Sequence, residues 1–341
     1  MLHRISCQAH RLPAHFWVAL TLSMLTLIAL SVQPDLTAQA APTGNVCGQI
    51  TTNITWIAAN NPYTVTCDVQ VMSGVTLTIQ SGVIVKFTTC TSLQVDGTLI
   101  ANGVTFTSGN APPARGDWGR IYFTPTSIDA AFNANGNYVS GSLIRDSLIE
   151  WGGGCVNVSG AIETNIASPL IDHNTVRNSS LYGIHAIARS TNKPIVISRN
   201  NLSINGGGIH VSTGTVISNT IANNYGTGIL AIGSTVTGNS VNANSGGGVD
   251  ASGSTVTSNT ISSNSGSPGA GVNATSSMIS DNIIAGNTTI YYYCGGIQAG
   301  GNSTVTRNTI NNNTSGGMAV VCASMAGAPL VILLRAIPHR D

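Results

Sequence analysis

The most constraining feature of this sequence is a unit of about 20 residues that recurs through its second half. Each unit contains a phrase close to Val-x-x-Asn-x-Ile, and short stretches of Gly, Ser and Asn join successive units. Self-similarity at this period, built from short β-branched segments, predicts a solenoid of stacked strands. The marker asparagines of these phrases are Asn174, Asn200, Asn219, Asn239, Asn259, Asn282 and Asn308.

The segments within each unit alternate apolar and polar residues, as in Ile209-His210-Val211-Ser212. In a strand, this alternation places one side against a core and the other side in water. Coiling such units stacks the strands in parallel at about 4.8 Å per turn, so equivalent residues lie above one another. Because the 39 glycines and the abundant Asn, Ser and Thr exclude helical repeats, we expect an all-β chain that forms a parallel β-helix.

The marker asparagines are expected to be structural. An Asn that turns inwards at a bend can hydrogen-bond through its amide to the equivalent Asn of the turns above and below, which forms an Asn ladder. Asn also tolerates the left-handed backbone that a sharp corner requires. A second Asn follows each marker by five residues, as at Asn205 and Asn244, and Asp146 is expected at the marker position of the first legible turn.

With these repeats, residues 141–325 resemble the right-handed parallel β-helix proteins that share the pectin-lyase-like fold. The stretches YTVTCDVQVMSGVTLTIQSGVIVKF, LQVDGTLIANGVTFTS and DWGRIYF look like the N-terminal turns of secreted bacterial members. The resemblance implies a right-handed parallel β-helix, or β-solenoid, with Asn ladders over most of the chain. It implies a shape rather than a reaction, because one fold hosts many functions.

The N-terminus has the pattern of a secretory signal peptide over residues 1–40. Basic residues precede an apolar run over residues 16–32, and Ala38-Gln39-Ala40 is a small-x-small cleavage signal. We expect cleavage near Ala40 and a location outside the cell or on its surface. An uncleaved membrane anchor is the alternative, because the run reaches the lower limit of a spanning helix.

The remaining chain divides into an N-terminal cap over residues 41–62, the parallel β-helix over residues 63–330 and an irregular C-terminal tail over residues 331–341. Three interpretations of the C-terminus stay open. It is the end of an incomplete coding sequence, a loosely packed cap, or a hydrophobic anchoring segment over residues 318–334.

Charge and cysteine usage limit the possible partners. Without residues 1–40 the chain has 13 − 2 = 11 basic and 12 − 1 = 11 acidic residues, and it has no basic run, which argues against nucleic acid or an anionic membrane as partner. The six cysteines beyond residue 40 fit disulfides in an oxidising compartment, with their pairing left open. The absence of a Cys-x-x-Cys pair gives zinc little support, and we expect a monomer without metal or cofactor.

The sequence contains no signature of an active glycan hydrolase. The resemblance implies that glycan-cleaving members of the fold use clustered acidic residues, either to divide acid and base roles or to hold a hard cation. Here the carboxylates are scattered, and the chain has no Asp-Asp, Asn-Thr-Asp, Gly-His-Gly or Arg-Ile-Lys stretch.

Two outward-facing columns follow from the predicted register. The residue after each Gly-apolar pair gives the column Asn157, His185, His210, Leu230, Asp250, Asn273 and Gln298. The residue before each marker Asn gives the column Arg145, His173, Arg199, Ser218, Gly238, Ser258, Asp281 and Arg307. Possible aromatic platforms for sugars are Trp118, Tyr122, Trp151 and Tyr182.

From these columns we expect a secreted protein that binds glycans, or serves as a structural surface module, without strong catalytic character. The alternative is a polysaccharide lyase or glycoside hydrolase that acts on an extended polysaccharide, and a third interpretation treats both columns as ordinary solvated faces. The expected ligand-binding residues are His173, His185, His210, Arg145, Arg177, Arg199, Trp151 and Asp250. The catalytic candidates are Glu150, His185 and His210.

Overall fold

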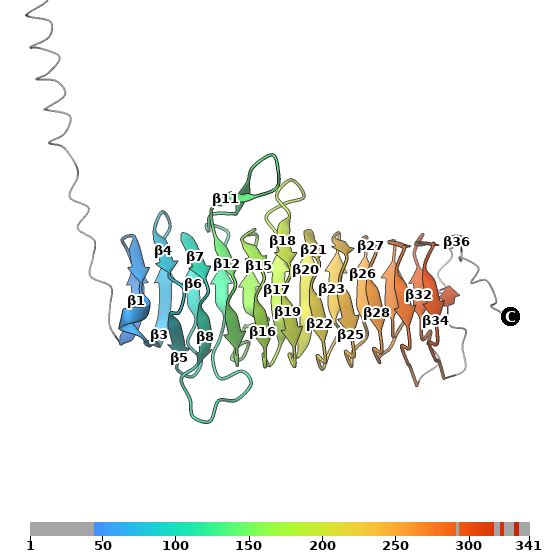
Figure 1. Ribbon diagram of the computed structural model, residues 1–341, viewed down its shortest axis with the longest axis horizontal. Helices are drawn as coiled ribbons and strands as arrows, with labels where there is room; N and C mark the ends of the chain where they lie inside the picture. Colours follow the sequence, from blue (N-terminus) through green and yellow to red (C-terminus); the bar gives the residue numbers. More distant parts are fainter. Residues whose placement is uncertain (1–43, 291–292, 317–320, 324–330, 334–341) are drawn as a thin grey trace, which may run out of the picture. The chain divides into compact units, whose positions relative to one another are not determined.

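The computed structural model describes residues 44–290, 293–316, 321–323 and 331–333. These residues form an all-β parallel β-solenoid in which one strand stacks on the next along the whole length (Figure 1). The described part contains a single turn of helix, the 3-10 helix η1 (Ala58–Asn60). The predicted β-solenoid is confirmed.

Each turn contributes a strand to each of three faces, and every pairing between turns is parallel. Face 1 contains β1 (Asn45–Ile50), β3 (Tyr63–Val71), β6 (Leu93–Val95), β9 (Ile121–Phe123), β14 (Gly160–Thr164), β17 (Tyr182–Ile187), β20 (Gly207–Ser212), β23 (Ile229–Ile232), β26 (Val249–Ser252), β29 (Val272–Thr275), β32 (Ile297–Gly300) and β35 (Val321–Ala323). The long strand β3 also turns the corner onto face 3.

The other two faces have shorter strands. Face 2 contains β2 (Ile54–Trp56), β4 (Thr76–Ile79), β7 (Thr98–Asn102), β12 (Leu143–Arg145), β15 (Leu170–Asp172), β18 (Ile195–Ser198), β21 (Gly214–Ile217), β24 (Thr235–Thr237), β27 (Thr255–Thr257), β30 (Met278–Ser280), β33 (Thr304–Thr306) and β36 (Val331–Leu333). Face 3 contains β5 (Ile84–Phe87), β8 (Thr105–Ser108), β13 (Leu148–Glu150), β16 (Thr175–Arg177), β19 (Asn201–Ser203), β22 (Thr220–Ala222), β25 (Ser240–Asn242), β28 (Thr260–Ser262), β31 (Ile283–Ala285) and β34 (Thr309–Asn311).

One antiparallel hairpin interrupts this regularity. Strands β10 (Ala131–Phe132) and β11 (Tyr138–Ser140) pair with each other and project from the solenoid between β9 and β12 (Figure 1). They lie in the stretch over residues 128–141 that departs from the repeat in the sequence.

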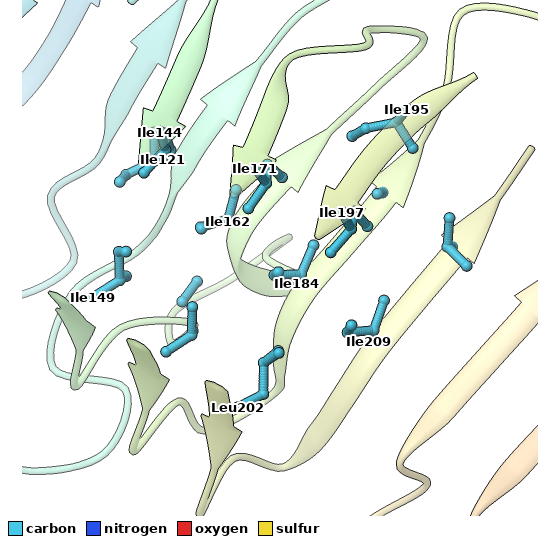
Figure 2. Close-up of a cluster of buried hydrophobic side chains, with 14 of the residues drawn as sticks. Ile121, Ile144, Ile149, Ile162, Ile171, Ile184, Ile195, Ile197, Leu202 and Ile209 are labelled. Carbon is cyan, nitrogen blue, oxygen red and sulfur yellow. The ribbon is translucent and has the colours of Figure 1, made fainter. Parts of the chain in front are cut away.

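The core is a set of apolar columns inside the three faces. Ile162, Ile184 and Ile209 stack on successive turns of face 1, and Ile171 and Ile197 do so on face 2 (Figure 2). All five side chains are fully buried. Truncating one such Ile to Ala typically costs about 2–5 kcal/mol, so these columns are a main source of stability.

The predicted Asn ladder is confirmed at the corner between faces 2 and 3. The side-chain amide of Asn239 donates to Oδ1 of Asn259 (3.0 Å) and to the carbonyl of Val216 (2.9 Å). Its own Oδ1 accepts hydrogen bonds from Nδ2 (3.0 Å) and the backbone N–H (2.8 Å) of Asn219. The same pattern joins Asn174 to Asn308 through every intervening marker. Ser147, and not Asp146, occupies the marker position one turn earlier.

Two further ladders stabilise the other corners. The second Asn of each unit forms an equivalent ladder between faces 3 and 1, as in the 2.9 Å bond from Asn224 to Asn244. Serines form a third ladder between faces 1 and 2, where the backbone N–H of Ser234 donates to Oγ of Ser254 (3.1 Å). The sequence did not predict the serine ladder, because Ser is frequent throughout the repeats.

The observed limits of the solenoid differ from the expected ones. Strands β1 and β2 already pair with β3 and β4, so the first turn lies within residues 41–62. Strand β36 pairs with β33 although it lies in the segment expected to be irregular. The expected signal peptide over residues 1–40 lies outside the described residues.

Three disulfides join cysteines whose pairing the sequence left open. They are Cys47–Cys67, Cys90–Cys155 and Cys294–Cys322. Disulfides persist in oxidising compartments, which fits a location outside the cytosol. Within the described ranges, none of the helical structure is long and apolar enough to span a membrane.

Candidate functional site

A continuous column of outward side chains follows face 1 from its first turn. From β1 to β32, strand pairing places one residue of each turn in this column: Gln49, Gln70, Gln94, Tyr122, Glu163, His185, His210, Leu230, Asp250, Asn273 and Gln298. We call this set the face 1 column. Its register from His185 to Gln298 is the one that the sequence predicted. In the turn before His185, the column contains Glu163 and not Asn157, which lies in the loop ahead of β14.

The centre of the face 1 column is a cluster of two imidazoles and a phenol. The rings of His185 and His210 meet edge to face, with centroids 4.5 Å apart. The ring of Tyr182 lies 5.5 Å from that of His210 and covers Gly207, where a Cβ atom would come within 2.5 Å of the phenol ring. Gly207 therefore gives Tyr182 the space to lie against His210.

Burial sets the protonation of this cluster. It lowers the pKa of His210 to about 4, and the neighbouring His185 adds to this effect. Burial also lowers the pKa of His185, although the negative charge of Glu163 opposes the change. The pKa of Tyr182 is raised, mainly by burial and further by Asp250. At neutral pH the cluster thus has neutral imidazoles that can accept a proton and a phenol that can donate one.

Asp250 lies two turns beyond His210 in the same column, with Leu230 between them. Burial raises the pKa of its carboxyl group, and a 3.1 Å hydrogen bond from Nδ2 of Asn273 only partly offsets this rise. The carboxyl group is thus harder to ionise than an exposed aspartate.

Glu163 extends the column on the other side of His185 and is held by Arg120. The Glu163 carboxylate accepts a 2.6 Å bond from Arg120 Nη1 and a 3.0 Å bond from the backbone N–H of Ser159. The Arg120 guanidinium also lies 4.1 Å from the ring centroid of Tyr122. Still earlier column residues, from Gln49 to Tyr122, line a pocket of about 280 Å³.

The two carboxylates of the face 1 column, Glu163 and Asp250, are too far apart to act as a hydrolytic pair. Glu163 and Asp250 are separated by four strand spacings, which is about 19 Å at 4.8 Å per strand. Glycosidases need their two carboxyl groups within about 5–10 Å of each other. Glu163 and Asp250 therefore do not act together as a hydrolytic pair.

Glu150 does not join the histidines, contrary to the grouping expected from the sequence. It lies on β13 of face 3, where its carboxylate pairs with Arg177 (2.8 Å) and accepts a bond from Thr107 (2.9 Å). Its neighbour Trp151 begins the corner that follows and packs partly against the core. Glu150 is close to β14 in the sequence, but a corner separates β13 on face 3 from β14 on face 1.

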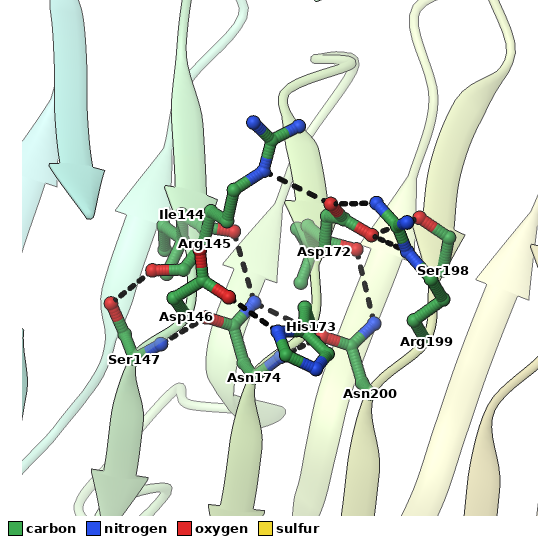
Figure 3. A network of polar contacts seen from close by, with 11 residues as sticks. Ile144, Arg145, Asp146, Ser147, Asp172, His173, Asn174, Ser198, Arg199 and Asn200 are labelled. Carbon is green, nitrogen blue, oxygen red and sulfur yellow. Dashed lines mark hydrogen bonds and ion pairs between the residues drawn. The ribbon is translucent and has the colours of Figure 1, made fainter. Parts of the chain in front are cut away.

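The remaining expected ligand-binding residues, Arg145, His173 and Arg199, form ion pairs with Asp172 and Asp146 at the corner between faces 2 and 3 (Figure 3). Asp172 is buried and accepts bonds from Arg145 (3.0 Å) and Arg199 (2.6 Å). His173 pairs with Asp146, which takes the position in the second column that was expected for Arg145. Burial favours a raised pKa for Asp172, but the bonds from Arg199 and Ser198 outweigh it and lower the pKa. These contacts favour a structural role.

The expected aromatic platforms divide between the core and the surface. Trp118 is fully buried and stacks on Phe87 with centroids 4.2 Å apart, so its expected role as a platform is wrong. Tyr122 and Tyr182 do lie on the outside of face 1. Within the described ranges, no group of three His, Cys, Asp or Glu side chains is placed to hold a metal ion.

Comparison with known proteins supports the architecture. Residues 212–331 match the family model described as "Right handed beta helix region". No curated protein sequence matches the chain.

Several solved structures have a similar fold at low identity. The A-module of the mannuronan C-5 epimerase AlgE4 of Azotobacter vinelandii is 12% identical, with a TM-score of 0.45, over 85% of this chain and 91% of that chain. The periplasmic alginate epimerase AlgG is 12% identical, with a TM-score of 0.46, over 88% and 83%. A PL6 alginate lyase in complex with a trisaccharide is 12% identical, with a TM-score of 0.37, over 91% and 83%. At this level of similarity, these structures do not define an activity for this chain.

Proposed function

We propose that this chain, a right-handed parallel β-helix protein, binds an extended polysaccharide along the face 1 column and cleaves it at Tyr182, His185 and His210. The observation that carries the proposal is the contact of the half-buried imidazoles of His185 and His210 with each other and with the phenol of Tyr182, at the centre of the face 1 column. The sequence alone favoured a non-catalytic protein, and the geometry of this cluster shifts the preference to the lyase alternative.

The binding part of the proposal rests on spacing and chemistry. Successive side chains of the column are about 4.8 Å apart, which is close to the length of one pyranose unit in an extended chain. Amide, phenol, imidazole and carboxyl groups offer the donors and acceptors that sugar hydroxyls require. A rigid solenoid presents these groups without a large cost in ordering entropy.

The catalytic part follows from the groups that the cluster contains. A neutral imidazole of His185 or His210 takes the proton from the sugar carbon next to a carboxylate, as a general base. The electron pair forms a carbon–carbon double bond as the adjacent glycosidic C–O bond breaks. The leaving oxygen takes a proton from the Tyr182 hydroxyl. This elimination requires a uronic acid, because the carboxylate makes the abstracted proton acidic.

The test is incubation with polysaccharides that contain uronic acids and with neutral polysaccharides, followed by ultraviolet absorbance of the unsaturated ends. We expect product only from the acidic polymers, and a loss of about a hundredfold or more in rate for His210→Gln or Tyr182→Phe. His173→Gln is the matched control, because it changes a histidine at another corner. Equal rates in all four proteins would contradict the catalytic assignment.

Binding without turnover is the second candidate, favoured by the length of the polar column beyond the cluster. A protein that only binds would be retained on polysaccharides, release no product, and lose affinity gradually as column residues are replaced. The proposed location is outside the cytosol, after removal of residues 1–40, in agreement with the three disulfides.

A further inference from the structure

Most of the described arginines and lysines form an ion pair with a carboxylate, and two do not. Ion pairs within 4.0 Å engage Arg120, Arg145, Arg177, Arg189, Lys193, Arg199 and Arg307. Within the described ranges, only Arg115 and Lys86 form no ion pair with a carboxylate at this distance. Lys86 lies on β5 of face 3, away from the face 1 column, whereas Arg115 lies beside it.

Arg115 belongs to the loop over residues 109–117 that joins β8 to β9 at the corner between faces 3 and 1. Its guanidinium lies over the ring of Tyr225, 4.3 Å from the centroid, and that tyrosine is 60% exposed. Its Nη2 donates to the carbonyl of Ser179 (2.8 Å), while its buried Nε has no hydrogen-bond partner. An exposed aromatic ring and an arginine without a carboxylate partner thus lie in contact.

This pair borders the catalytic cluster. Oγ of Ser179 donates to the carbonyl of Tyr182 (3.0 Å), so one serine contacts both Arg115 and the cluster. The backbone N–H of Tyr225 donates to the carbonyl of Asn205, at the corner that leads to Gly207 and His210. Ser179 and Asn205 therefore connect the Arg115–Tyr225 pair to the main chain that leads into the cluster.

The loop is fixed to the solenoid and not free to swing away. The Asp117 carboxylate accepts bonds from the backbone N–H of Ala114 (2.7 Å) and Oγ of Ser108 (2.6 Å). A Cβ atom at Gly116 would come within 2.8 Å of Ser180 Oγ and 3.2 Å of Gly154, which shows how closely the loop packs. The Cys90 backbone N–H, next to the disulfide with Cys155, donates to the Asp117 carbonyl (3.0 Å).

We infer that Arg115 and Tyr225 form a binding subsite for an acidic sugar, in which the guanidinium pairs with a carboxylate and the tyrosine ring supports the pyranose. Guanidinium groups bind planar carboxylates through two parallel hydrogen bonds, and aromatic rings pack on sugar faces. This inference rests on the proposed function for its substrate class. It adds two residues outside the face 1 column, of which Arg115 selects acidic over neutral sugars and Tyr225 supports the pyranose of either.

The test compares the affinities of a tetrasaccharide of galacturonate and its fully methyl-esterified form by calorimetry on the folded full chain. The ester keeps the sugar face and removes the charge. We expect the wild-type protein to prefer the acid, and Arg115→Gln to lose roughly tenfold or more in affinity for the acid alone, because a charged hydrogen bond is lost. Arg115→Lys, which keeps the charge, should recover part of the loss, and Lys86→Gln is the matched control.

Each outcome separates this inference from the proposed function. Arg115-dependent binding of the acid without turnover would support the subsite and contradict the proposed cleavage. If Arg115→Gln bound and cleaved an acidic polysaccharide as the wild type does, the subsite would be overturned. The proposed cleavage at the Tyr182, His185 and His210 cluster would still stand. Equal wild-type affinity for acid and ester, or binding of neither, would overturn the subsite. Tyr225→Ala should weaken both ligands, because the ring contacts the sugar and not its charge.

Discussion

The imidazoles of His185 and His210 face each other edge to face on adjacent turns, with ring centroids 4.5 Å apart. This contact makes each ring part of the apolar surroundings of the other. Burial lowers the pKa of both rings, and the neighbouring His185 lowers the pKa of His210 further, so both imidazoles are neutral at neutral pH.

The histidine contact predicts a loss of stability in mild acid. The pKa of His210 in the folded state, about 4, lies below the ordinary value of 6.5, so the unfolded chain binds more protons between these values. The free energy of unfolding therefore falls as the pH drops through this window, and it is unaffected by His210 above it. Urea unfolding at a series of pH values should show a smaller decrease for His210→Gln than for the wild type. An unchanged pH profile would contradict burial of a neutral pair.

The Asn ladder predicts a large cost for a substitution that preserves size. Asn239→Leu removes the bonds to Asn259 and Val216 and leaves the buried N–H of Asn219 without its acceptor. We expect the free energy of unfolding to fall by about 3 kcal/mol or more. The control is Asn242→Leu, because Asn242 is exposed on β25. Similar losses in both variants, measured by thermal or urea unfolding, would contradict the ladder.

The pairing of Glu150 predicts that its role is structural. Glu150→Gln should leave polysaccharide binding and turnover unchanged, because its side chain points away from face 1 and contacts Arg177 and Thr107. Its effect should be a loss of about 1 kcal/mol in stability, since the pair is partly exposed. A large loss of turnover with normal folding would show that the assignment of the active face is wrong.

The buried carboxylate of Asp172 should contribute more to the free energy of unfolding than the more exposed carboxylate of Asp281 at a later turn. Asp172 is 1% exposed and pairs with two arginines, whereas Asp281 is 40% exposed and pairs with Arg307. Asp172→Asn should cost about 2 kcal/mol and Asp281→Asn less than 1 kcal/mol. Because the pKa of Asp172 is lowered in the folded state, its contribution is present at neutral pH and lost as the pH falls below about 4. Equal costs in urea unfolding would contradict this difference.

The disulfide between Cys90 and Cys155 should stabilise both the fold and the loop over residues 109–117. It joins residues 65 positions apart, for which the chain-entropy relation gives about 4 kcal/mol. We expect the double Ala variant to unfold at a lower temperature and to bind acidic oligosaccharides less tightly, because the Arg115 loop loses an anchor. Unfolding at the wild-type temperature would show that the bond contributes little.

The sequence predicted the features that strict periodicity determines. From His185 onwards each turn repeats the Gly-apolar pair, so a count along the chain gave the correct outward column. Before that point the loop over residues 151–159 interrupts the repeat, and Glu163 was missed. The alternation in Gly160-Ala161-Ile162-Glu163 was the available signal.

Contacts between distant loops could not be read from the sequence. Arg115 meets Tyr225 because a loop before β9 reaches a corner before β23, four turns along the solenoid. No periodic pattern specifies that path. The face of an isolated residue was equally hard to assign, as Glu150 shows, because a corner separates it from histidines that are close in sequence.

The most direct test of the central claim is mass spectrometry of the soluble products from an acidic polysaccharide, compared between the wild type and His210→Gln. We expect oligosaccharides whose masses are one water lower than those of hydrolysis products, formed by the wild type and almost absent with the variant. An intact polymer, or saturated oligosaccharides formed equally by both proteins, would contradict elimination at the Tyr182, His185 and His210 cluster.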